Sequence, residues 1–309
     1  MNKKKSIFLK LYSLISPIIA YIWIIRIFIK SWGERDEISR IDERMGISSC
    51  KRPKGKLIWF HAVSLGESIS ILPLIKLLVK NKNINVLITS STASSAYIIS
   101  KQLPNKAIHQ FSPIDYHKWI DRFIDHWKPN IALRVESELW PNTLNALEFN
   151  QIPILLLNGR ISQKSFKKWK TFPKLARDVI KTIDLILAQS QNEAKKFEQI
   201  GAENIVVIGN LKNSSPPLPI DSIFKKQLAY KINNRPVWVA ASIHNKEEQL
   251  VINTHIYLKK IWPNILTIIA PRHPEHEKKI KQISKRLNLK CSNRTDDNLP
   301  NTNTDIFIL

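Results

Sequence analysis

The side chains that could do chemistry gather where short apolar runs give way to polar loops. The loop at residues 61–68 places Gly66 and Glu67 between an apolar run and a stretch with helical apolar spacing. The dipole of a helix favours the ionised form of a carboxylate in its first turn. An ionised carboxylate at the mouth of a cleft can take a proton from a hydroxyl group. Glu67 is therefore a candidate general base, although first-turn glutamates without a catalytic role are also common.

A second loop, at residues 134–142, carries Glu136 and Glu138. Two residues two positions apart on an extended segment point the same way, and carboxylates at a strand end are costly to bury unless they are paired or used. These glutamates could act on a substrate. Alternatively, one of them caps the helix that follows Pro141 or pairs with Arg134, and the residues alone leave these alternatives open.

Cationic side chains mark the remaining loops. Lys212 precedes a proline-rich stretch, and its ammonium group suits an anionic ligand, although an isolated lysine is more often plain surface. Pro271 and Arg272 lie at an expected strand end just before a helix, which is an ordinary arrangement for holding a phosphate. Ser242 and His244 occupy the equivalent place one strand earlier. His244 and His273 could bind a metal, but no second pair with ligand spacing supports them, so we expect no metal site.

Strands and helices must position these loops. Along the chain, short apolar runs alternate with stretches that have helical apolar spacing. Strands are expected at 57–60, 86–88, 131–135, 154–157, 185–188, 206–208, 237–241, 266–270 and 307–309. Helices are expected at 69–79, 96–100, 115–127, 192–200, 247–262 and 275–287. Such alternation predicts parallel sheets with helices on both faces, and ligands bind at the carboxyl ends of their strands. The fold class is therefore α/β, with two Rossmann-like, doubly wound domains.

The expected domain organisation has four parts. They are an anchor at 1–30, a first domain at 31–212, a linker with three prolines at 213–220, and a partial second domain at 221–309. Residues 31–56 are polar and are interpreted as a connector to the first strand. Only two full strand–helix units follow the linker.

The N-terminal 30 residues are basic and then apolar. A helix over residues 11–29 would be roughly 28 Å long, which is barely the thickness of a bilayer core. Pro17 lies inside it and Arg26 interrupts the uncharged run. Lys and Arg occur on both flanks, so charge does not decide orientation. A marginal membrane span, an in-plane amphipathic anchor and a buried helix of the globular body all remain open.

The composition points to an anionic partner. The chain has 48 Lys and Arg against 25 Asp and Glu, a net charge of +23, which suits a phospholipid surface, a phosphorylated substrate or nucleic acid. The basic residues are spread along the chain, which argues against nucleic acid. Cys50 and Cys291 fit no motif, so a reducing compartment is the default. The sequence lacks the glycine-rich dinucleotide motif, the P-loop and the nucleophile elbow.

Taken together, these segments resemble the Kdo (3-deoxy-D-manno-octulosonic acid) transferases of lipopolysaccharide synthesis. The matching stretches occur in family order: Trp32-Gly33-Glu34-Arg35, His61-Ala62-Val63-Ser64-Leu65-Gly66-Glu67, Glu136-Ser137-Glu138-Leu139-Trp140-Pro141-Asn142, Gly209-Asn210-Leu211-Lys212, Ala241-Ser242-Ile243-His244 with Glu247-Glu248, and Pro271-Arg272-His273-Pro274-Glu275. The resemblance implies a glycosyltransferase fold of the B type, with an acceptor-binding first domain and a nucleotide-sugar-binding second domain. It also implies transfer of Kdo from CMP-Kdo to lipid IVA, a lipid A precursor, at the cytoplasmic side of the inner membrane, without a metal or cofactor.

The resemblance also assigns roles to residues. Glu67 matches the catalytic base of an inverting, single displacement, and Glu136 and Lys212 match positions that stabilise the transition state. The matches to the donor site and its surroundings are Pro271, Arg272, Ser242, His244 and Glu138. The chemistry is consistent, because the Kdo carboxylate and the departing phosphate bring negative charge to cationic side chains. A phosphorylated lipid acceptor likewise explains the apolar N-terminus and the basic surface.

The chain departs from the family pattern at three points. Lys246 stands where the family usually has a glycine, and Asn213 replaces an aromatic residue. The family's second domain continues well past Leu309, so we expect this chain alone to bind CMP-Kdo poorly and to be inactive or unstable. Measurable transfer by purified 1–309 would contradict that expectation. The alternatives are a catalytically inactive membrane-surface protein of the same family and, on net charge alone, a nucleic-acid binder.

Overall fold

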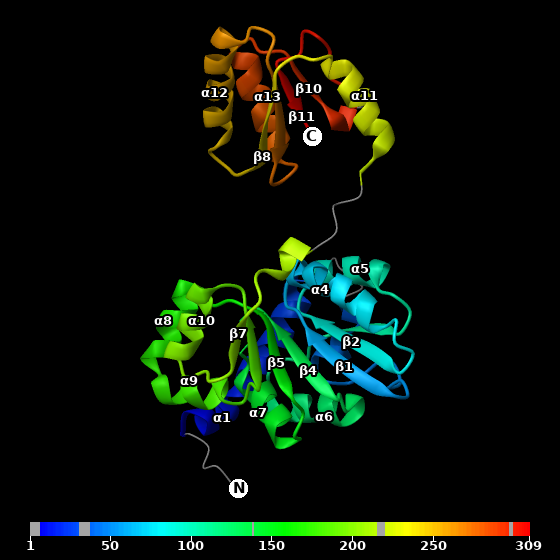
Figure 1. Cartoon of the computed structure of the whole chain (residues 1–309), viewed down its shortest axis with the longest axis vertical. Coiled ribbons are helices and arrows are strands. Elements are labelled where there is room, and N and C mark those ends of the chain that lie inside the picture. The colour runs from blue at the N-terminus through cyan, green and yellow to red at the C-terminus, as the bar shows by residue number, and fades with distance from the viewer. Residues whose placement is uncertain (1–6, 31–37, 138, 215–219, 297–298) are drawn as a thin grey trace. The chain divides into compact units, whose positions relative to one another are not determined.

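The protein folds into two compact units. The computed structural model describes residues 7–30, 38–137, 139–214, 220–296 and 299–309. Unit 1 comprises Met1–Pro216 and unit 2 comprises Pro217–Leu309 (Figure 1). Each unit packs helices on both faces of a parallel sheet, which confirms the expected α/β class. Most of the expected linker, at 215–219, lies outside the described residues.

Unit 1 is built on a seven-stranded parallel sheet in the order β3-β2-β1-β4-β5-β6-β7. Its strands are β1 (Lys56–His61), β2 (Ile84–Ser90), β3 (Ala107–Phe111), β4 (Ile131–Val135), β5 (Ile154–Gly159), β6 (Leu185–Ala188) and β7 (Ile205–Val207). Strand order reverses direction between β1 and β4. In open parallel sheets the crevice outside the strand ends at such a switch point is where ligands bind.

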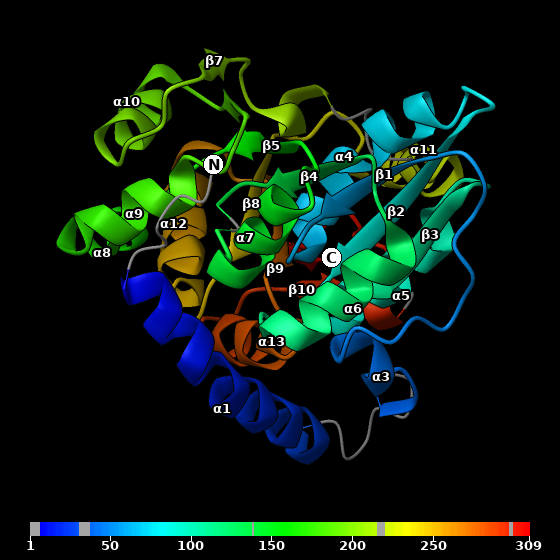
Figure 2. The ribbon, with the colours of Figure 1, turned by 90° about the horizontal axis from the view of Figure 1, so that it is seen from below.

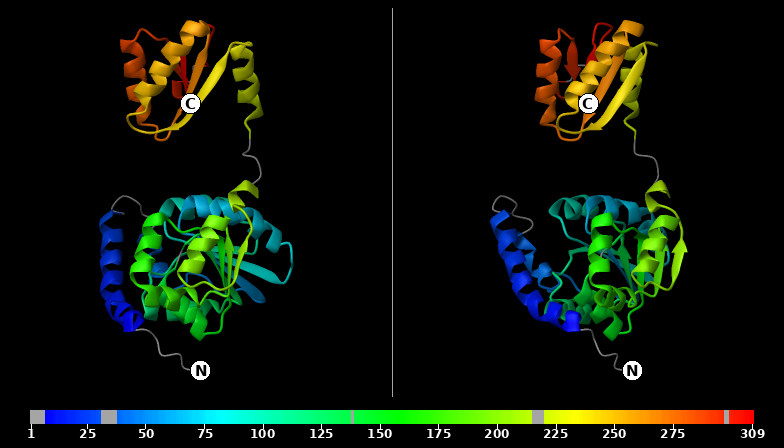
Figure 3. Two further views of the ribbon diagram at one scale, coloured as in Figure 1. Left: turned by 60° about the vertical axis from the view of Figure 1, so that its left-hand side comes forward. Right: turned by 90° about the vertical axis from the view of Figure 1, so that its left-hand side faces the viewer.

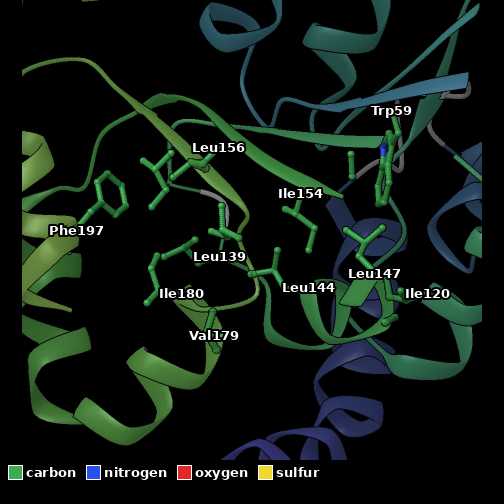
Figure 4. Close-up of a cluster of buried hydrophobic side chains, with 14 of the residues drawn as sticks. Trp59, Ile120, Leu139, Leu144, Leu147, Ile154, Leu156, Val179, Ile180 and Phe197 are labelled. Atoms are coloured by element: carbon green, nitrogen blue, oxygen red, sulfur yellow. The ribbon is translucent and has the colours of Figure 1, made fainter. Parts of the chain in front are cut away.

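Two cores lie on opposite faces of this sheet. One face is covered by α4 (Leu65–Leu78) and α5 (Ala93–Gln102). The other is covered by α6 (His117–Trp127), α7 (Pro141–Phe149), α8 (Gln163–Thr171), α9 (Pro173–Ile180) and α10 (Gln191–Gln199). Figure 4 shows this second core, in which Trp59, Leu144 and Phe197 are buried among aliphatic side chains. Burial of apolar surface at roughly 25 cal/mol per Å² makes these two layers the main support of the switch point.

Every strand expected from the sequence is present, with ends within two residues of the expectation. Strand β3 was not expected, because its centre is polar. His109 Nε2 lies 2.9 Å from Ser90 Oγ, and Gln110 Oε1 accepts a hydrogen bond from Trp127 Nε1 at 2.8 Å. Tertiary partners thus bond the His109 ring and the Gln110 side-chain oxygen, two polar groups that look unsuited to a buried strand.

Helix α1 (Ile7–Lys30) packs along the outside of unit 1 with one narrow face (Figure 3). Ser16, Ala20 and Ile24 are buried at a spacing of four residues, and the last two contact a cluster with Tyr116 and Trp119. Residues 9–29 are long and apolar enough to cross a membrane, yet only 11% of this stretch is buried in the protein. The alternative of a buried helix of the globular body is therefore wrong.

Polar bonds tie the N-terminal half of α1 to the same unit. Tyr12 Oη donates to Asp115 Oδ2 at 2.9 Å, and Ser13 Oγ donates to Asn142 Oδ1 at 2.5 Å. Asp115 also accepts the backbone N–H groups of Asn142 and Thr143, the first free amides of α7. Helix α1 is thus held at the N-terminal end of α7, a few residues after the loop that carries Glu136.

Residues 38–56 are part of unit 1 rather than a connector. In α3 (Ile41–Arg44), the buried Glu43 accepts two bonds from Arg40 at 3.0 and 2.8 Å and one from the Phe111 amide at 2.7 Å. Arg44 donates to the Ser91 carbonyl at 2.8 Å, and its guanidinium lies 4.1 Å from the centroid of the Phe111 ring. The connector interpretation is wrong for residues 38–56, because Arg40, Glu43 and Arg44, three of the charged residues that suggested it, bond inside the fold. The other part of the expected connector, residues 31–37, lies outside the described residues.

Unit 2 has a four-stranded parallel sheet in the order β10-β11-β9-β8. The strands are β8 (Val237–Ile243), β9 (Leu266–Pro271), β10 (Cys291–Asn293) and β11 (Ile306–Ile308). Helices α12 (Glu248–Ile261) and α13 (His276–Arg286) pack on one face, and α11 (Ser222–Ile232) packs on the other. The expected strands and helices of this unit are confirmed, while β10 and α11 were not expected.

Candidate functional site

Glu67 lies at the switch point of unit 1, in the first turn of α4. The Ser64 hydroxyl accepts the Glu67 N–H at 3.3 Å and donates to Glu67 Oε1 at 2.8 Å, while the Val63 N–H donates to Oε2 at 2.8 Å. This reciprocal arrangement is a variant of the capping box, in which the carboxylate reaches the Ser64 hydroxyl and the Val63 amide rather than the amide of the N-cap residue Ser64. The side chain is 9% exposed. The carboxylate is therefore held rigidly at the carboxyl end of β1. Glu67 also has the structural role that was the alternative to catalysis, because it bonds groups at the start of a helix.

Glu136 lies across the switch point from Glu67, directly after β4. Its φ of +60° falls in the left-handed region, which is strained for a residue with a side chain. The expectation of an extended segment is therefore wrong at this position, because the chain turns there. The alternative that Glu136 caps α7 is also wrong, since Asp115 accepts the first amides of that helix. The turn instead brings Glu136 Oε1 to 3.0 Å from Lys212 Nζ.

Lys212 comes from the opposite end of unit 1 in sequence. It lies in the 3-10 helix η1 (Leu211–Ser214), which follows β7 and packs against α4. Leu211 contacts the core beneath α4. Of the predicted catalytic residues, Glu136 and Lys212 are in direct contact, and Glu67 lies at the same end of the sheet.

Asn158 holds η1 in place, a role that the sequence did not reveal. It is the penultimate residue of β5, is fully buried and has a φ of +56°. Its Oδ1 accepts the Leu211 N–H at 3.0 Å, across 53 residues of sequence. Asparagine tolerates the left-handed region better than most residues, so its side chain can reach η1 from the end of a strand. The Nδ2 of Asn158 has no partner among the residues that the structure describes.

Buried cations lie beneath the ends of β1, β2 and β4. Arg134 and Arg44 are 2% and 4% exposed. His61, on β1, bonds Thr89 Oγ1 through Nδ1 at 2.9 Å. Burial, reinforced by the charges of Arg134 and Arg44, holds the pKa of His61 well below its usual value, so the ring is neutral. The His61 ring therefore adds no charge beneath the switch point, where the buried side chains of Arg44 and Arg134 lie together with the carboxylates of Glu43 and Glu67.

The predicted donor-site residues of unit 2 lie together at the ends of the neighbouring strands β8 and β9. A bulge separates Ala241 from Ile243 in their pairing, and the residue between them, Ser242, has a φ of +57°. The Arg272 N–H donates to the Ile243 carbonyl at 3.0 Å. The Arg272 side chain is exposed, and Pro271, the last residue of β9, is partly buried.

The loop after β8 is closed by its own glutamates. The His244 N–H donates to Glu247 Oε2 at 2.7 Å, and the Lys246 N–H donates to Glu248 Oε2 at 2.8 Å. Lys246 has a φ of +80°. This is a conformation that glycine adopts freely, so the lysine at this position occupies a backbone shape suited to the glycine that the resemblance led us to expect.

Two expected pieces lie outside the described residues, namely Glu138 and the stretch 32–35. Among the residues that are described, no group of three or more His, Cys, Asp or Glu side chains is placed to hold a metal ion. The side chains that the structure places at the switch point of unit 1 are the carboxylates of Glu67 and Glu136 and the ammonium group of Lys212.

Comparison with known proteins identifies the chain's relatives. The family model for 3-deoxy-D-manno-octulosonic-acid transferases matches residues 39–215. A 3-deoxy-D-manno-octulosonic acid transferase of Rickettsia bellii is 33% identical over 302 residues, covering 97% of this chain and 72% of its own. That of Rickettsia felis is 37% identical over 82% of this chain, and a probable transferase of Arabidopsis thaliana is 37% identical over 79%. This chain spans 54% and 57% of the lengths of these last two relatives.

Solved structures support the fold. UDP-GlcNAc 2-epimerase from Neisseria meningitidis aligns with a TM-score of 0.52 at 15% identity, covering 82% of this chain and 71% of its own. A UDP-N-acetylglucosamine 2-epimerase from Listeria monocytogenes, described as putative, aligns with a TM-score of 0.53 at 12% identity, covering 75% and 66%. These likenesses confirm the expected B-type glycosyltransferase architecture. From its sequence relatives, the chain belongs to the 3-deoxy-D-manno-octulosonic acid (Kdo) transferase family.

Proposed function

We propose that this chain is a CMP-Kdo:lipid IVA Kdo transferase, a glycosyltransferase of lipopolysaccharide synthesis. Membership of the Kdo transferase family supports the donor and the transferred sugar. The observation that supports a catalytic site in unit 1 is the ion pair between Glu136 and Lys212. This pair lies with Glu67 at the carboxyl ends of the strands, where parallel sheets bind ligands.

In the proposed reaction, a hydroxyl oxygen of lipid IVA attacks the anomeric carbon of Kdo. The bond from that carbon to the phosphate oxygen of CMP breaks, CMP leaves with the electron pair, and the configuration inverts. Glu67 takes the hydroxyl proton. Its two bonds, from the Val63 amide and the Ser64 hydroxyl, hold the carboxylate in one orientation.

Glu136 and Lys212 stabilise the charges that develop in this reaction. The Glu136 carboxylate suits positive character on the Kdo ring, and the Lys212 ammonium suits the Kdo carboxylate or the departing phosphate. Because the two groups hold each other at 3.0 Å, they are oriented before substrate arrives.

The remaining site residues serve the donor. We assign Pro271, Arg272, Ser242 and His244 to CMP-Kdo, together with Glu138. The strand ends of β8 and β9 that carry the first four support this assignment, since the exposed Arg272 lies just before the start of α13, where a phosphate is favoured. In this scheme residues 31–212 bind the acceptor, 213–220 link the two domains, and 221–309 bind the nucleotide sugar.

Helix α1 would attach the protein to phospholipid at the cytoplasmic side of the inner membrane. Its buried face contacts α6 and α7, and its outer face exposes large apolar side chains such as Ile18, Ile22 and Ile29. A helix bound to a globular body along one side is suited to lying in the membrane plane rather than crossing it. Residues 1–30 therefore act as an in-plane anchor.

The test is transfer of radiolabelled Kdo from CMP-Kdo to lipid IVA. Glu67→Gln is the decisive variant, because glutamine also completes a capping box but cannot accept the proton. We expect Glu67→Gln to fold and bind CMP as the parent does while losing transfer. Transfer by the parent would overturn the expectation, drawn from the sequence, that residues 1–309 alone bind CMP-Kdo poorly, and no transfer by the parent would refute the proposed activity. Equal transfer by the two proteins would refute Glu67 as the base.

The exposed apolar face of α1 also favours a second function, that of a catalytically inactive membrane-surface protein of the same family. That protein would bind liposomes through residues 1–30, would transfer no Kdo, and would be unchanged by Glu67→Gln. The same transfer assay therefore separates the two functions.

A further inference from the structure

The α8–α9 hairpin concentrates positive charge in unit 1. Residues 163–181 contain seven cationic side chains and one acidic side chain, Asp178, in a chain with a net charge of +23. Helices α8 and α9 are consecutive and joined at Phe172. No activity proposed above uses this surface.

The fold directs these charges outward. Phe166 of α8 and Ala176, Val179 and Ile180 of α9 are buried in the core beneath them. This leaves Lys164, Lys167, Lys168, Lys170, Lys174 and Arg177 exposed, and none of them forms an ion pair with another residue in the described ranges. A charged helix face is ordinarily balanced by acidic neighbours or spread among them. Here one sign dominates, which creates a local field that attracts anions.

This cationic surface lies on the same side of unit 1 as α1. Helix α7 contacts both α1 and α9. The N-terminal end of α1 lies beside α8 and α9 in Figure 2, and in Figure 1 α1, α7 and α9 again lie on one side of the sheet. An apolar helix and a lysine-rich hairpin therefore flank the same helix.

We propose that the α8–α9 hairpin binds the anionic headgroups of the bilayer whose acyl boundary receives the exposed face of α1. This inference rests on the proposed membrane attachment and extends it to a defined second contact. The charge of the hairpin is complementary to acidic phospholipid, and its half-exposed Phe172 suits the membrane interface, where aromatic rings are enriched.

Two contacts on one face have a consequence for the site. If α1 alone contacted the bilayer, the whole of unit 1 could rotate about the axis of α1. Contact through both α1 and the basic hairpin fixes which side of unit 1 faces the lipid. Because Asn142 contacts α1, the Glu136 loop is then held close to the membrane surface from which a lipid acceptor comes.

The experiment measures flotation of the purified chain with two kinds of vesicle. One is phosphatidylcholine alone, and the other is phosphatidylcholine mixed with phosphatidylglycerol. The test variant carries Lys167→Gln, Lys168→Gln and Lys174→Gln. The matched control carries Lys76→Gln, Lys80→Gln and Lys82→Gln, which change the same charge at or just after α4 on the opposite face.

We expect the test variant to bind the anionic vesicles on the order of 100-fold more weakly than the parent, about fivefold for each lysine removed. The control should lose much less, and binding to phosphatidylcholine alone should be the same for all three proteins. Equal losses in the two variants would overturn the proposal, because net charge rather than the hairpin would then be responsible. Circular dichroism and thermal unfolding confirm that the variants fold.

Two further results separate this inference from the proposed attachment. If Ile18→Ser with Ile22→Ser abolishes binding to both vesicles while the hairpin variant binds like the parent, attachment through α1 stands and the hairpin proposal fails. If the parent binds neither vesicle, both fail. Binding of the parent to RNA in preference to anionic vesicles, with loss in the hairpin variant, would assign the hairpin to nucleic acid and refute the proposal.

Discussion

Replacement of Asn158 should release Lys212 from the switch point without unfolding the protein. The Asn158 side chain accepts the Leu211 N–H at 3.0 Å and is fully buried. Loss of the partner of a buried donor costs about 1 to 3 kcal/mol. Glycine is the informative replacement, because it keeps the φ of +56° without strain and removes only the side chain.

The assay is hydrogen exchange of the Leu211 amide, followed by mass spectrometry. If the bond accounts for about 1 to 3 kcal/mol of the local opening free energy, exchange in Asn158→Gly should be roughly 5- to 150-fold faster. Amides in β1 and β4 serve as internal controls and should change little. The rate of Lys212 acylation should rise in parallel, because η1 would no longer hold the ammonium beside Glu136.

Asn158→Ala adds backbone strain to the same loss. A left-handed conformation costs a residue with a β-carbon about 1 to 2 kcal/mol, so alanine should unfold more easily than glycine while the two variants show similar Leu211 exchange. An unchanged Leu211 amide in Asn158→Gly would refute the reasoning, since it would show that packing of Leu211 alone holds η1.

Three further outcomes test other parts of the structure. Burial, with nearby arginines, lowers the pKa of His109 to about 3. Between pH ~6.5 and pH ~3 the unfolded chain therefore binds a proton at this residue that the folded chain does not. The free energy of unfolding should fall on acidification through this range, by up to roughly 1.4 kcal/mol per pH unit. His109→Gln should remove that share of the slope in urea titrations at several pH values, and an identical slope would contradict it. Asp115→Ala strands the Tyr12 hydroxyl and two amides of α7, so the free energy of unfolding should drop by about 3 kcal/mol or more, against about 1 kcal/mol for Tyr12→Phe. Equal losses would show that the two amides of α7 do not depend on this carboxylate. Lys212→Ala should change the free energy of unfolding by less than about 1 kcal/mol, because its pair with Glu136 is partly exposed. The same variant should lower kcat for Kdo transfer by about 10²- to 10³-fold. A change confined to KM would instead show that Lys212 contributes to binding of the ground state.

Most strands could be predicted from the sequence because buried strands consist of short apolar runs. The run at 131–135 coincides with β4, and that at 185–188 coincides with β6. Strand β3 escaped prediction because His109 and Gln110 interrupt its apolar character, and their partners come from Ser90 and Trp127. Helices α8 and α9 escaped because lysines obscure the few side chains that face the core.

The candidate site was predictable in its residue types and not in its geometry. Glu67 was expected near a helix N-terminus, and it is there. The left-handed turn at Glu136 and the bond from Asn158 to Leu211 depend on segments far apart in the sequence meeting at one strand end. No local pattern encodes such meetings, so the contact between Glu136 and Lys212 required the three-dimensional structure.

The left-handed backbone at consecutive strand ends has a consequence for how this protein tolerates sequence drift. At Glu136 and Asn158 the main chain alone would accept glycine most readily, whereas the side chains that meet η1 would then be lost. A saturation library scored separately for soluble expression and for growth dependent on the enzyme should rank glycine high in the first and low in the second at both positions. Such a divergence would identify the positions at which a strained backbone is kept because the side chain there binds η1.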